Sequence, residues 1–197
     1  LANTLAAHMD YDSPGARSRV ADFWGTGAVA DGPGLKAVDL FDAIDQGKVK
    51  AVWIMATNPV VSLPDADKIK RALGKCELVV VSDVMARTDT SEFAHVLLPA
   101  QGWGEKDGTV TNSERCISRQ RAFLPAIGEA RPDWWALSQV ACRMGFAEHF
   151  AYESVHEIFD EHARLTAHQN GPEDALPRYL NLDGLVGLDR TDFDDLQ

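Results

Sequence analysis

The sequence lacks the short motifs that mark most nucleotide, metal and hydrolase sites. It contains neither GxGxxG nor GxxxxGK, so the usual fingerprints of NAD-binding and NTP-binding folds are missing. It also contains no GxSxG and no HExxH, and its six histidines are dispersed. We therefore expect this chain alone to form neither a catalytic centre nor a metal site.

Long apolar runs, paired cysteines and basic clusters are missing too. The apolar runs are far shorter than the roughly 20 residues that span a bilayer, and no signal peptide is recognised, so no membrane association is expected. The three cysteines, Cys76, Cys116 and Cys142, are too widely spaced for a CxxC metal motif, and their odd number argues against a secreted disulfide framework. We expect them to be small packing residues in a reduced, cytoplasmic protein.

The balance of charge is strongly acidic. Thirty acidic residues stand against 19 basic ones, for a formal net charge of −11, and the basic residues form no cluster that could follow a phosphate backbone. Nucleic acid is therefore not expected as a partner.

A length of 197 residues with 45% hydrophobic content is enough for one good core. The chain starts Leu1-Ala2-Asn3 without a methionine, and we expect it to be a piece of a longer polypeptide. Composition and periodicity predict three parts: an irregular lead-in over 1–34, an α/β portion over 35–146, and a helical, loop-rich peripheral tail over 147–197.

Three short apolar runs carry the fold prediction. They cover 51–56, 78–81 and 96–99, and each is followed by turn-forming or polar residues. Helical spacing over 35–46, closed by Gly47, and over 64–74, closed by Gly74, separates or precedes them. Continuous apolar strands alternating with helices are typical of a parallel sheet covered on both faces, so we predict a Rossmann-like α/β fold with flanking helices.

The remaining elements are predicted less sharply. A short helix should start at Thr88–Glu92, and 116–124 should be an extended arm or an edge strand. An amphipathic helix should run from Pro132 to Gly145, and a further helix should cover 155–165. His95, beside an apolar strand, is expected to be structural rather than a base.

Polar side chains follow the predicted strands. In a parallel sheet the carboxyl ends of the strands share one edge, where ligands bind, so Asn58, Ser82, Asp83 and Lys106 are expected along one rim. Each residue also has a simpler interpretation. Asn58-Pro59 is a common turn, Ser82-Asp83 could cap a helix, and Lys106 lies in an ordinary loop composition. The segment Asn112–Arg115 offers amide and guanidinium donors but is equally typical of a solvated patch.

The order of these segments resembles the molybdopterin-dependent oxidoreductases of the dimethyl sulfoxide reductase family, most of all bacterial nitrate reductase catalytic subunits of the assimilatory type. The resemblance covers about residues 35–146. The segments that carry it are Trp53–Pro59, Val79–Asp83, Ala94–Ala100, Trp103–Arg115 and Gly128–Trp135.

The resemblance implies an incomplete portion of a larger multidomain enzyme. Such enzymes hold molybdenum between two molybdopterin guanine dinucleotides, carry a four-iron four-sulfur cluster, and reduce nitrate to nitrite by oxygen-atom transfer. Their partners would be the remaining domains of the parent and an electron-donor protein or subunit. The cluster cysteines and the metal-ligating cysteine have no counterpart in this chain, so the piece is expected to be inactive and to retain no intact cofactor.

By the same resemblance, Asn58, Ser82, Asp83, Lys106 and Asp133 match contacts to a guanine dinucleotide, and Glu105, Thr109 and Asn112 are weaker candidates. Asp133 would otherwise pass as a helix cap. Three alternatives stay open: a portion of a formate dehydrogenase, a portion of a periplasmic nitrate reductase, or a non-catalytic binding or scaffold module.

Overall fold

The computed structural model describes residues 7, 9–27, 29–114, 116–174, 178 and 180–196. Its contacts divide the chain into two compact units. The sheet unit comprises Leu35–Asp107 and Arg121–Ala151, and the hairpin unit comprises Leu1–Gly34, Gly108–Gln120 and Tyr152–Gln197. The three-part domain organisation expected from the sequence, with 35–146 as one portion, stays a prediction.

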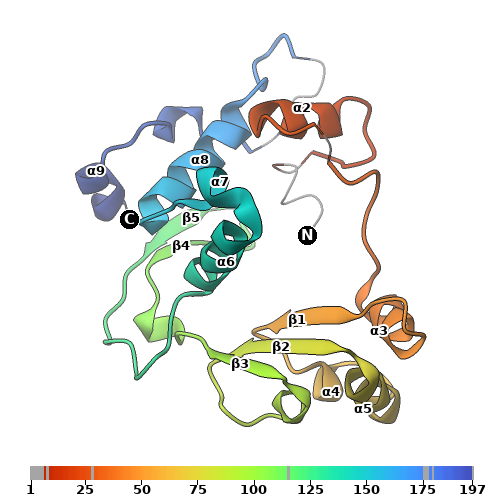
Figure 1. The fold of residues 1–197 in the computed structure, drawn as a ribbon. Coiled ribbons are helices and arrows are strands. Elements are labelled where there is room, and N and C mark those ends of the chain that lie inside the picture. The colour runs from red at the N-terminus through yellow and green to blue at the C-terminus, as the bar shows by residue number, and fades with distance from the viewer. Residues whose placement is uncertain are drawn as a thin grey trace. The chain divides into compact units, whose positions relative to one another are not determined.

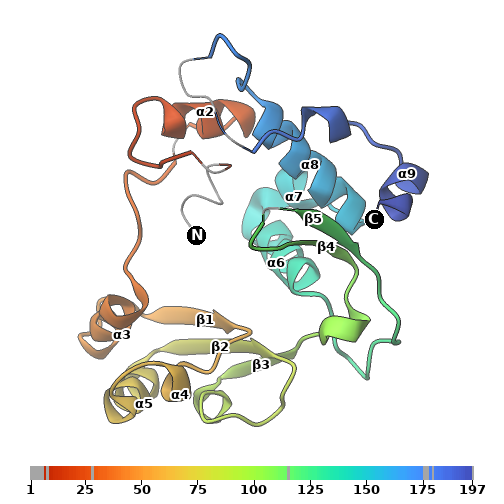
Figure 2. The ribbon, with the colours of Figure 1, turned by 180° about the vertical axis from the view of Figure 1, so that it is seen from behind.

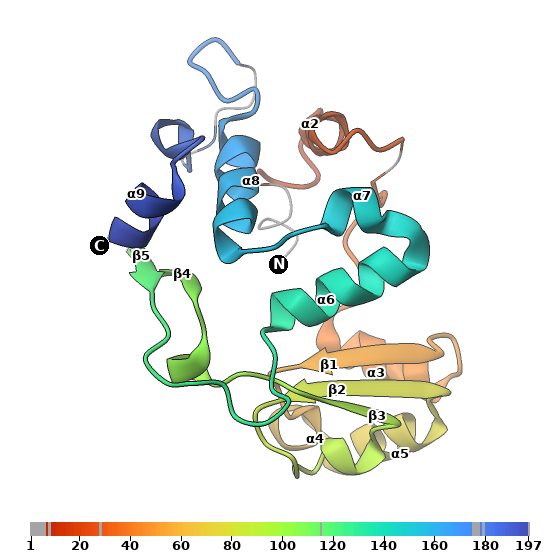
Figure 3. The same ribbon diagram turned by 60° about the vertical axis from the view of Figure 1, so that its left-hand side comes forward.

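The sheet unit is built on three parallel strands in the order β1-β2-β3 (Figure 3). These are β1 (Ala51–Met55), β2 (Leu78–Asp83) and β3 (Val96–Pro99), close to the three apolar runs. Ile54 of β1 is level with Val81 of β2, which is level with Leu97 of β3. The predicted parallel α/β arrangement is therefore confirmed, and the carboxyl ends of the strands lie along one edge.

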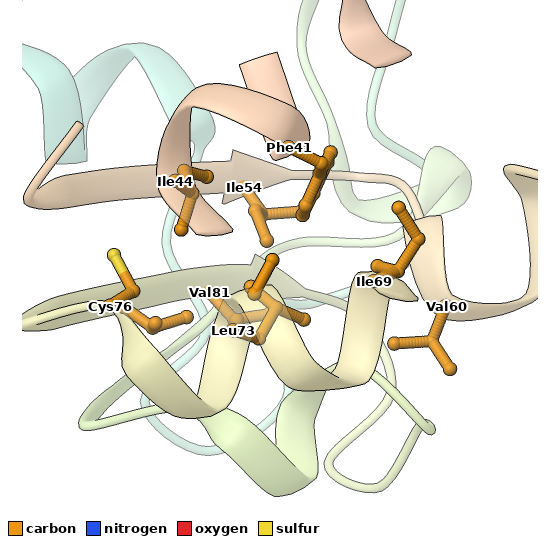
Figure 4. Packing of buried hydrophobic residues seen from close by; sticks show 10 residues of the cluster. Phe41, Ile44, Ile54, Val60, Ile69, Leu73, Cys76 and Val81 are labelled. Atoms are coloured by element: carbon orange, nitrogen blue, oxygen red, sulfur yellow. The ribbon is translucent and has the colours of Figure 1, made fainter. Parts of the chain in front are cut away.

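Helices α3 (Ala37–Asp45), α4 (Pro59–Ser62) and α5 (Ala66–Lys75) accompany this sheet. Buried side chains of α3 and α5, such as Ile44 and Leu73, pack with Ile54 and Val81 of the strands in one core (Figure 4). Gly47, at a φ of 72°, follows the end of α3 as predicted. The helix predicted over 64–74 does not end at Gly74. It corresponds to α5, which continues one residue further, to Lys75.

The segment between β2 and β3 contains a short helical turn and His95, both of which were predicted from the sequence. The short helix expected at Thr88–Glu92 is only a single 3-10 turn, η1 (Ser91–Phe93). His95 is structural, as expected, because its Nδ1 accepts a hydrogen bond of 2.9 Å from the backbone N–H of Val79.

The helix expected from Pro132 to Gly145 is divided. It consists of α6 (Asp133–Ala141) and a π-type turn, η3 (Cys142–Phe146), in which Gly145 has a φ of 97°, and α7 (Ala147–Phe150) follows. In Figures 1 and 3, α6 lies on the side of the sheet opposite α4 and α5. Its apolar side chains Leu137 and Val140 are exposed, as is Met144 in η3, so the predicted apolar face is present but largely uncovered.

The hairpin unit contains β4 (Gly108–Thr111) and β5 (Ile117–Gln120), which pair antiparallel (Figure 2). For 116–124 the sequence predicted an extended arm or an edge strand, and the structure has a strand over Ile117–Gln120. The helices of this unit are α2 (Ala16–Phe23), α8 (Val155–Ala167), η4 (Asp183–Leu185) and α9 (Arg190–Asp195). The helix predicted over 155–165 corresponds to α8.

The hairpin unit is held together by contacts between distant segments. Trp24 Nε1 donates to Glu161 of α8 over 3.3 Å, and Arg119 of β5 pairs with Asp194 of α9 at 2.9 Å. This unit is thus assembled from the beginning, the middle and the end of the chain.

The cysteines differ in their surroundings. Cys76 is buried in the core of the sheet unit, as expected of a packing residue, whereas Cys116 is exposed and does not fit that expectation. Within the ranges that the structure describes, no helix is long and apolar enough to cross a membrane.

Candidate functional site

A cavity of about 330 Å³ lies at the carboxyl edge of the parallel sheet. Its lining comes from the residues that follow each strand, together with Lys106 and Asp133. The lining residues are Ala56, Thr57, Asn58, Asp83, Val84, Met85, Thr88, Ala100, Lys106 and Asp133. The structure therefore brings together Asn58, Asp83, Lys106 and Asp133, which are far apart in the sequence.

Asp133 reaches this rim because the segment before α6 runs beside the end of β3. Ala100 and Arg131 form a parallel bridge, in which Arg131 donates to Pro99 O and Gln101 donates to Arg131 O, each over 3.1 Å. Asp133 is the first residue of α6. Its Oδ2 accepts from Lys106 and its Oδ1 has no partner among the described residues, so its carboxylate does not cap the helix.

Lys106 is held by the turn that precedes it. In η2 (Trp103–Glu105), Glu105 accepts from the backbone N–H of Gly102 with Oε2 at 2.7 Å and from that of Ile127 with Oε1 at 3.0 Å. Both carboxylate oxygens are used in joining two loops, so Glu105 supports the rim without lining the cavity.

Lys106 and Asp133 form an ion pair across the cavity wall. Lys106 Nζ lies 2.7 Å from Asp133 Oδ2, and both side chains are about 70% buried, with exposures of 29% and 28%. The other oxygen, Asp133 Oδ1, is buried and has no hydrogen-bond partner among the described residues. Because a buried carboxylate oxygen normally accepts a hydrogen bond, this atom marks a place for a ligand donor.

Asn58 is not occupied with capping its own helix. It precedes α4, but its side chain makes no capping bond there. Instead its Oδ1 accepts a hydrogen bond of 2.6 Å from the hydroxyl of Thr90, and that hydroxyl accepts the N–H of Val60 at 3.2 Å. The simple turn interpretation therefore does not explain the Asn58 amide, which lines the cavity.

Asp83 and Ser82 have different positions. Asp83 Oδ1 accepts from Met85 N–H at 2.9 Å, which is a local turn, while its Oδ2 has no hydrogen bond to any described residue and the side chain lines the cavity. Ser82 is 2% exposed and does not line it; its hydroxyl accepts from Trp53 Nε1 at 2.8 Å. The structure thus gives Ser82 a partner within the sheet.

The other two weaker candidates do not line the cavity. Thr109 and Asn112 belong to the hairpin unit, where Asn112 Oδ1 accepts the N–H groups of Glu114 and Cys116 in the turn between β4 and β5. Arg115 lies outside the described residues.

Several residues of the site were not singled out from the sequence. Val84, Met85 and Thr88 line the cavity because the loop after β2 continues along the rim. Ala56 also lines it, with a left-handed φ of 52°, a conformation that costs energy for a residue with a β-carbon. Extending the strand-end rule by a few residues past Asp83 would have found the loop; nothing local in the sequence indicates the φ of Ala56.

The described residues offer few alternatives to this site. A hollow of about 450 Å³ in the hairpin unit, near Asn170 and Arg178, contains none of the predicted site residues. Among the residues described, no group of three or more His, Cys, Asp and Glu side chains could hold a metal ion. Chemically, the cavity at the sheet edge offers amide and ammonium donors beside carboxylate acceptors, which suits a polar organic ligand with groups of both kinds.

The sequence is similar to known proteins over its whole length. Residues 5–143 match the family model described as molybdopterin oxidoreductase. The chain is 53% identical over its whole length to a nitrate reductase of Klebsiella oxytoca and 50% identical to one of Shewanella frigidimarina, covering 22% and 20% of those proteins. Formate dehydrogenases are less similar.

A solved structure, acetylene hydratase from Pelobacter acetylenicus, is similar with a TM-score of 0.56 and 26% identity. The similarity covers 63% of this chain and 18% of that one. The chain thus spans about a fifth of the relatives that it matches over its whole length. With a family model matched over most of its residues, the chain belongs to the molybdopterin oxidoreductase family.

Proposed function

We propose that this chain is a cofactor-binding portion of a molybdenum-dependent nitrate reductase, and that the cavity at the sheet edge holds the guanine nucleotide end of a molybdopterin guanine dinucleotide. The observation that carries the proposal is the convergence of Asn58, Asp83, Lys106 and Asp133 on one cavity, with Asp133 Oδ1 buried and unpartnered. A carboxylate there suits the N–H groups of a guanine or the hydroxyls of a ribose.

The family implies a molybdenum–molybdopterin cofactor, and the residues of the cavity fit its nucleotide end. Asp83 and Asp133 would accept hydrogen bonds, Asn58 would donate, and Lys106 would bring a positive charge to the pyrophosphate. The bound metal centre would supply the oxygen-atom and electron transfer. The guanine dinucleotide form, the four-iron cluster, a role in nitrate assimilation, and partnership with the remaining domains and an electron donor are parts of the same proposal, drawn from the resemblance. A cytoplasmic location is also proposed, on the pattern of the cysteines.

Nucleotide binding can be tested with this chain. We expect GDP to bind weakly but saturably in a titration followed by nuclear magnetic resonance. Asp133→Asn should abolish binding, because it places an amide N–H where a carboxylate oxygen now lies. Asp67→Asn removes the same charge from an exposed position on α5 and should bind as the wild type does. Failure of the folded wild type to bind GDP, or equal binding by both variants, would contradict the proposal for this cavity.

The reaction requires the full-length parent protein. The close nitrate reductase relatives favour nitrate, whose reduction to nitrite consumes two electrons and two protons and releases water. We expect the purified parent to oxidise a reduced dye when nitrate is added. Turnover of formate in place of nitrate would favour the alternative of a formate dehydrogenase.

A further inference from the structure

Thr90 lies behind the cavity rather than in its wall. It is fully buried, at 0% exposure, in the loop between β2 and η1. Its hydroxyl touches two groups on the other side of the rim: it accepts the N–H of Val60 at 3.2 Å and lies 2.6 Å from Oδ1 of Asn58. The capping of α4 is thus supplied by a residue 30 positions away in the sequence.

These two contacts decide which way the Asn58 amide faces. A backbone N–H can only donate, so it takes a lone pair of the Thr90 oxygen, and the hydroxyl proton needs an acceptor of its own. Within the described part of the chain, the only acceptor near it is the Asn58 side chain. If the NH₂ group faced Thr90, a buried hydroxyl proton would be left without a partner, which is strongly disfavoured.

The NH₂ group of Asn58 must therefore point away from Thr90. Asn58 lines the cavity, and its Nδ2 makes no hydrogen bond to any described residue. An asparagine that can rotate its amide accepts or donates according to the ligand, whereas this one can only donate. We propose that Thr90 is a positioning residue that fixes Asn58 as a hydrogen-bond donor, so that the bound ligand must place an acceptor against it.

This inference rests on the proposed nucleotide site and narrows its chemistry. The acceptor belongs to the base, as O6 or N7 of guanine, or to the pyrophosphate, as one of its oxygens. Titration with guanosine and with inorganic pyrophosphate separates these two sources, since only the ligand that reaches Asn58 should lose affinity when Asn58 is changed.

The orientation can be tested without any ligand. In labelled wild-type protein we expect a slowly exchanging hydroxyl proton of Thr90 and only weak nuclear Overhauser effects from it to the Asn58 NH₂ protons. Strong effects between them would place the NH₂ group against Thr90 and overturn the inference. This result does not depend on GDP binding, so it separates failure of the inference from failure of the proposed site.

Binding provides the second test. Asn58→Asp keeps an oxygen that faces Thr90 but replaces the donor with a negatively charged acceptor. We expect GDP affinity to fall at least about tenfold, through the lost hydrogen bond together with repulsion between the new carboxylate and the phosphates. Thr90→Val keeps the shape but removes the hydroxyl and should weaken binding by a similar factor, while Thr90→Ser should restore it. Wild-type affinity in folded Thr90→Val or in Asn58→Asp would overturn the proposal. Should Thr90→Val not fold, the nuclear Overhauser measurement on the wild type still decides the orientation of the Asn58 amide.

Discussion

At the scale of single residues, the site depends on side chains that do not line the cavity. Glu105 uses both carboxylate oxygens to join the turn before Lys106 to the loop before α6. Thr90 holds the amide of Asn58, and Ser82 holds the indole of Trp53. Polar residues beside a predicted ligand rim are therefore divided between those available to a ligand and those that support them.

Glu105→Gln tests this supporting role. A glutamine can accept only one of the two backbone N–H groups and would direct its NH₂ toward the other. We expect a loss of about 1 kcal/mol in the free energy of unfolding, measured by urea denaturation, and weaker GDP binding because Lys106 shifts. Glu92→Gln, at an exposed position of η1, is the matched control. Equal stability of the two variants would show that the two hydrogen bonds of Glu105 do not stabilise the fold.

A second residue-scale prediction concerns acid stability. The hydrogen bond from the nearly buried Arg119 side chain lowers the pKa of Asp194 below its ordinary value of 3.8. A depressed carboxyl pKa stabilises the fold above the ordinary value, and this contribution is lost as the pH falls through the lowered pKa. We expect Asp194→Asn to flatten the fall in stability below about pH 4.

The measurement is the thermal unfolding midpoint between pH 2 and pH 6, with Asp195→Asn, an exposed neighbour on α9, as the control. If Asp194→Asn and Asp195→Asn give the same pH profile, the contact with Arg119 does not contribute.

At the scale of elements, the sheet unit depends on one layer of helices. Leu73 of α5 is 1% exposed in the core that joins α5 to β1 and β2. Leu73→Ala should therefore lower the free energy of unfolding by about 2 to 5 kcal/mol, through lost burial and the cavity left behind. Val61→Ala, at a position 66% exposed, should cost far less. A small effect at Leu73 would mean that the core can close around the missing atoms.

The strands could be predicted because their apolar runs are continuous and bounded by turn residues, a pattern typical of parallel strands. The ends of helices were less predictable. Gly74 is a common helix terminator, yet α5 continues one residue past it, to Lys75. The exact residue at which a helix ends depends on its terminal geometry, which the glycine alone does not determine.

Some residues of the candidate site could be predicted from the sequence and others could not. Asn58, Asp83 and Lys106 could be proposed because parallel strands bring their carboxyl ends to one edge. Asp133 needed the resemblance, since its place depends on the bridge between Ala100 and Arg131. Thr90 could not be found, because its role depends on a contact 32 residues away that no local pattern reports.

At the scale of the whole molecule, acidity and exposed apolar surface act against each other. The net charge of −11 opposes association at neutral pH, but Val96 and Leu97 on the edge strand β3 and Met144 in η3 are exposed. As the pH approaches the isoelectric point of about 4.9, this repulsion disappears. We expect self-association that grows toward that pH, as an open sheet edge favours.

This self-association can be measured as the molecular mass given by light scattering coupled to gel filtration, between pH 5 and pH 8 at high protein concentration. Val96→Lys places a charge on the edge strand and should reduce the association. A monomeric mass at every pH would count against association through the edge strand β3.

The interleaved make-up of the two units also has a consequence for biosynthesis. The strands β1 and β2 and the two helices between them, α4 and α5, are contiguous, so this part can form soon after it leaves the ribosome. Helix α2 cannot complete its native contacts at that stage, because Trp24 at its end donates to Glu161, 137 residues later. At ordinary rates of translation that is a delay of roughly ten seconds. Helix α2 is therefore made well before the residue that completes its native contacts, and a chaperone has that interval in which to bind it.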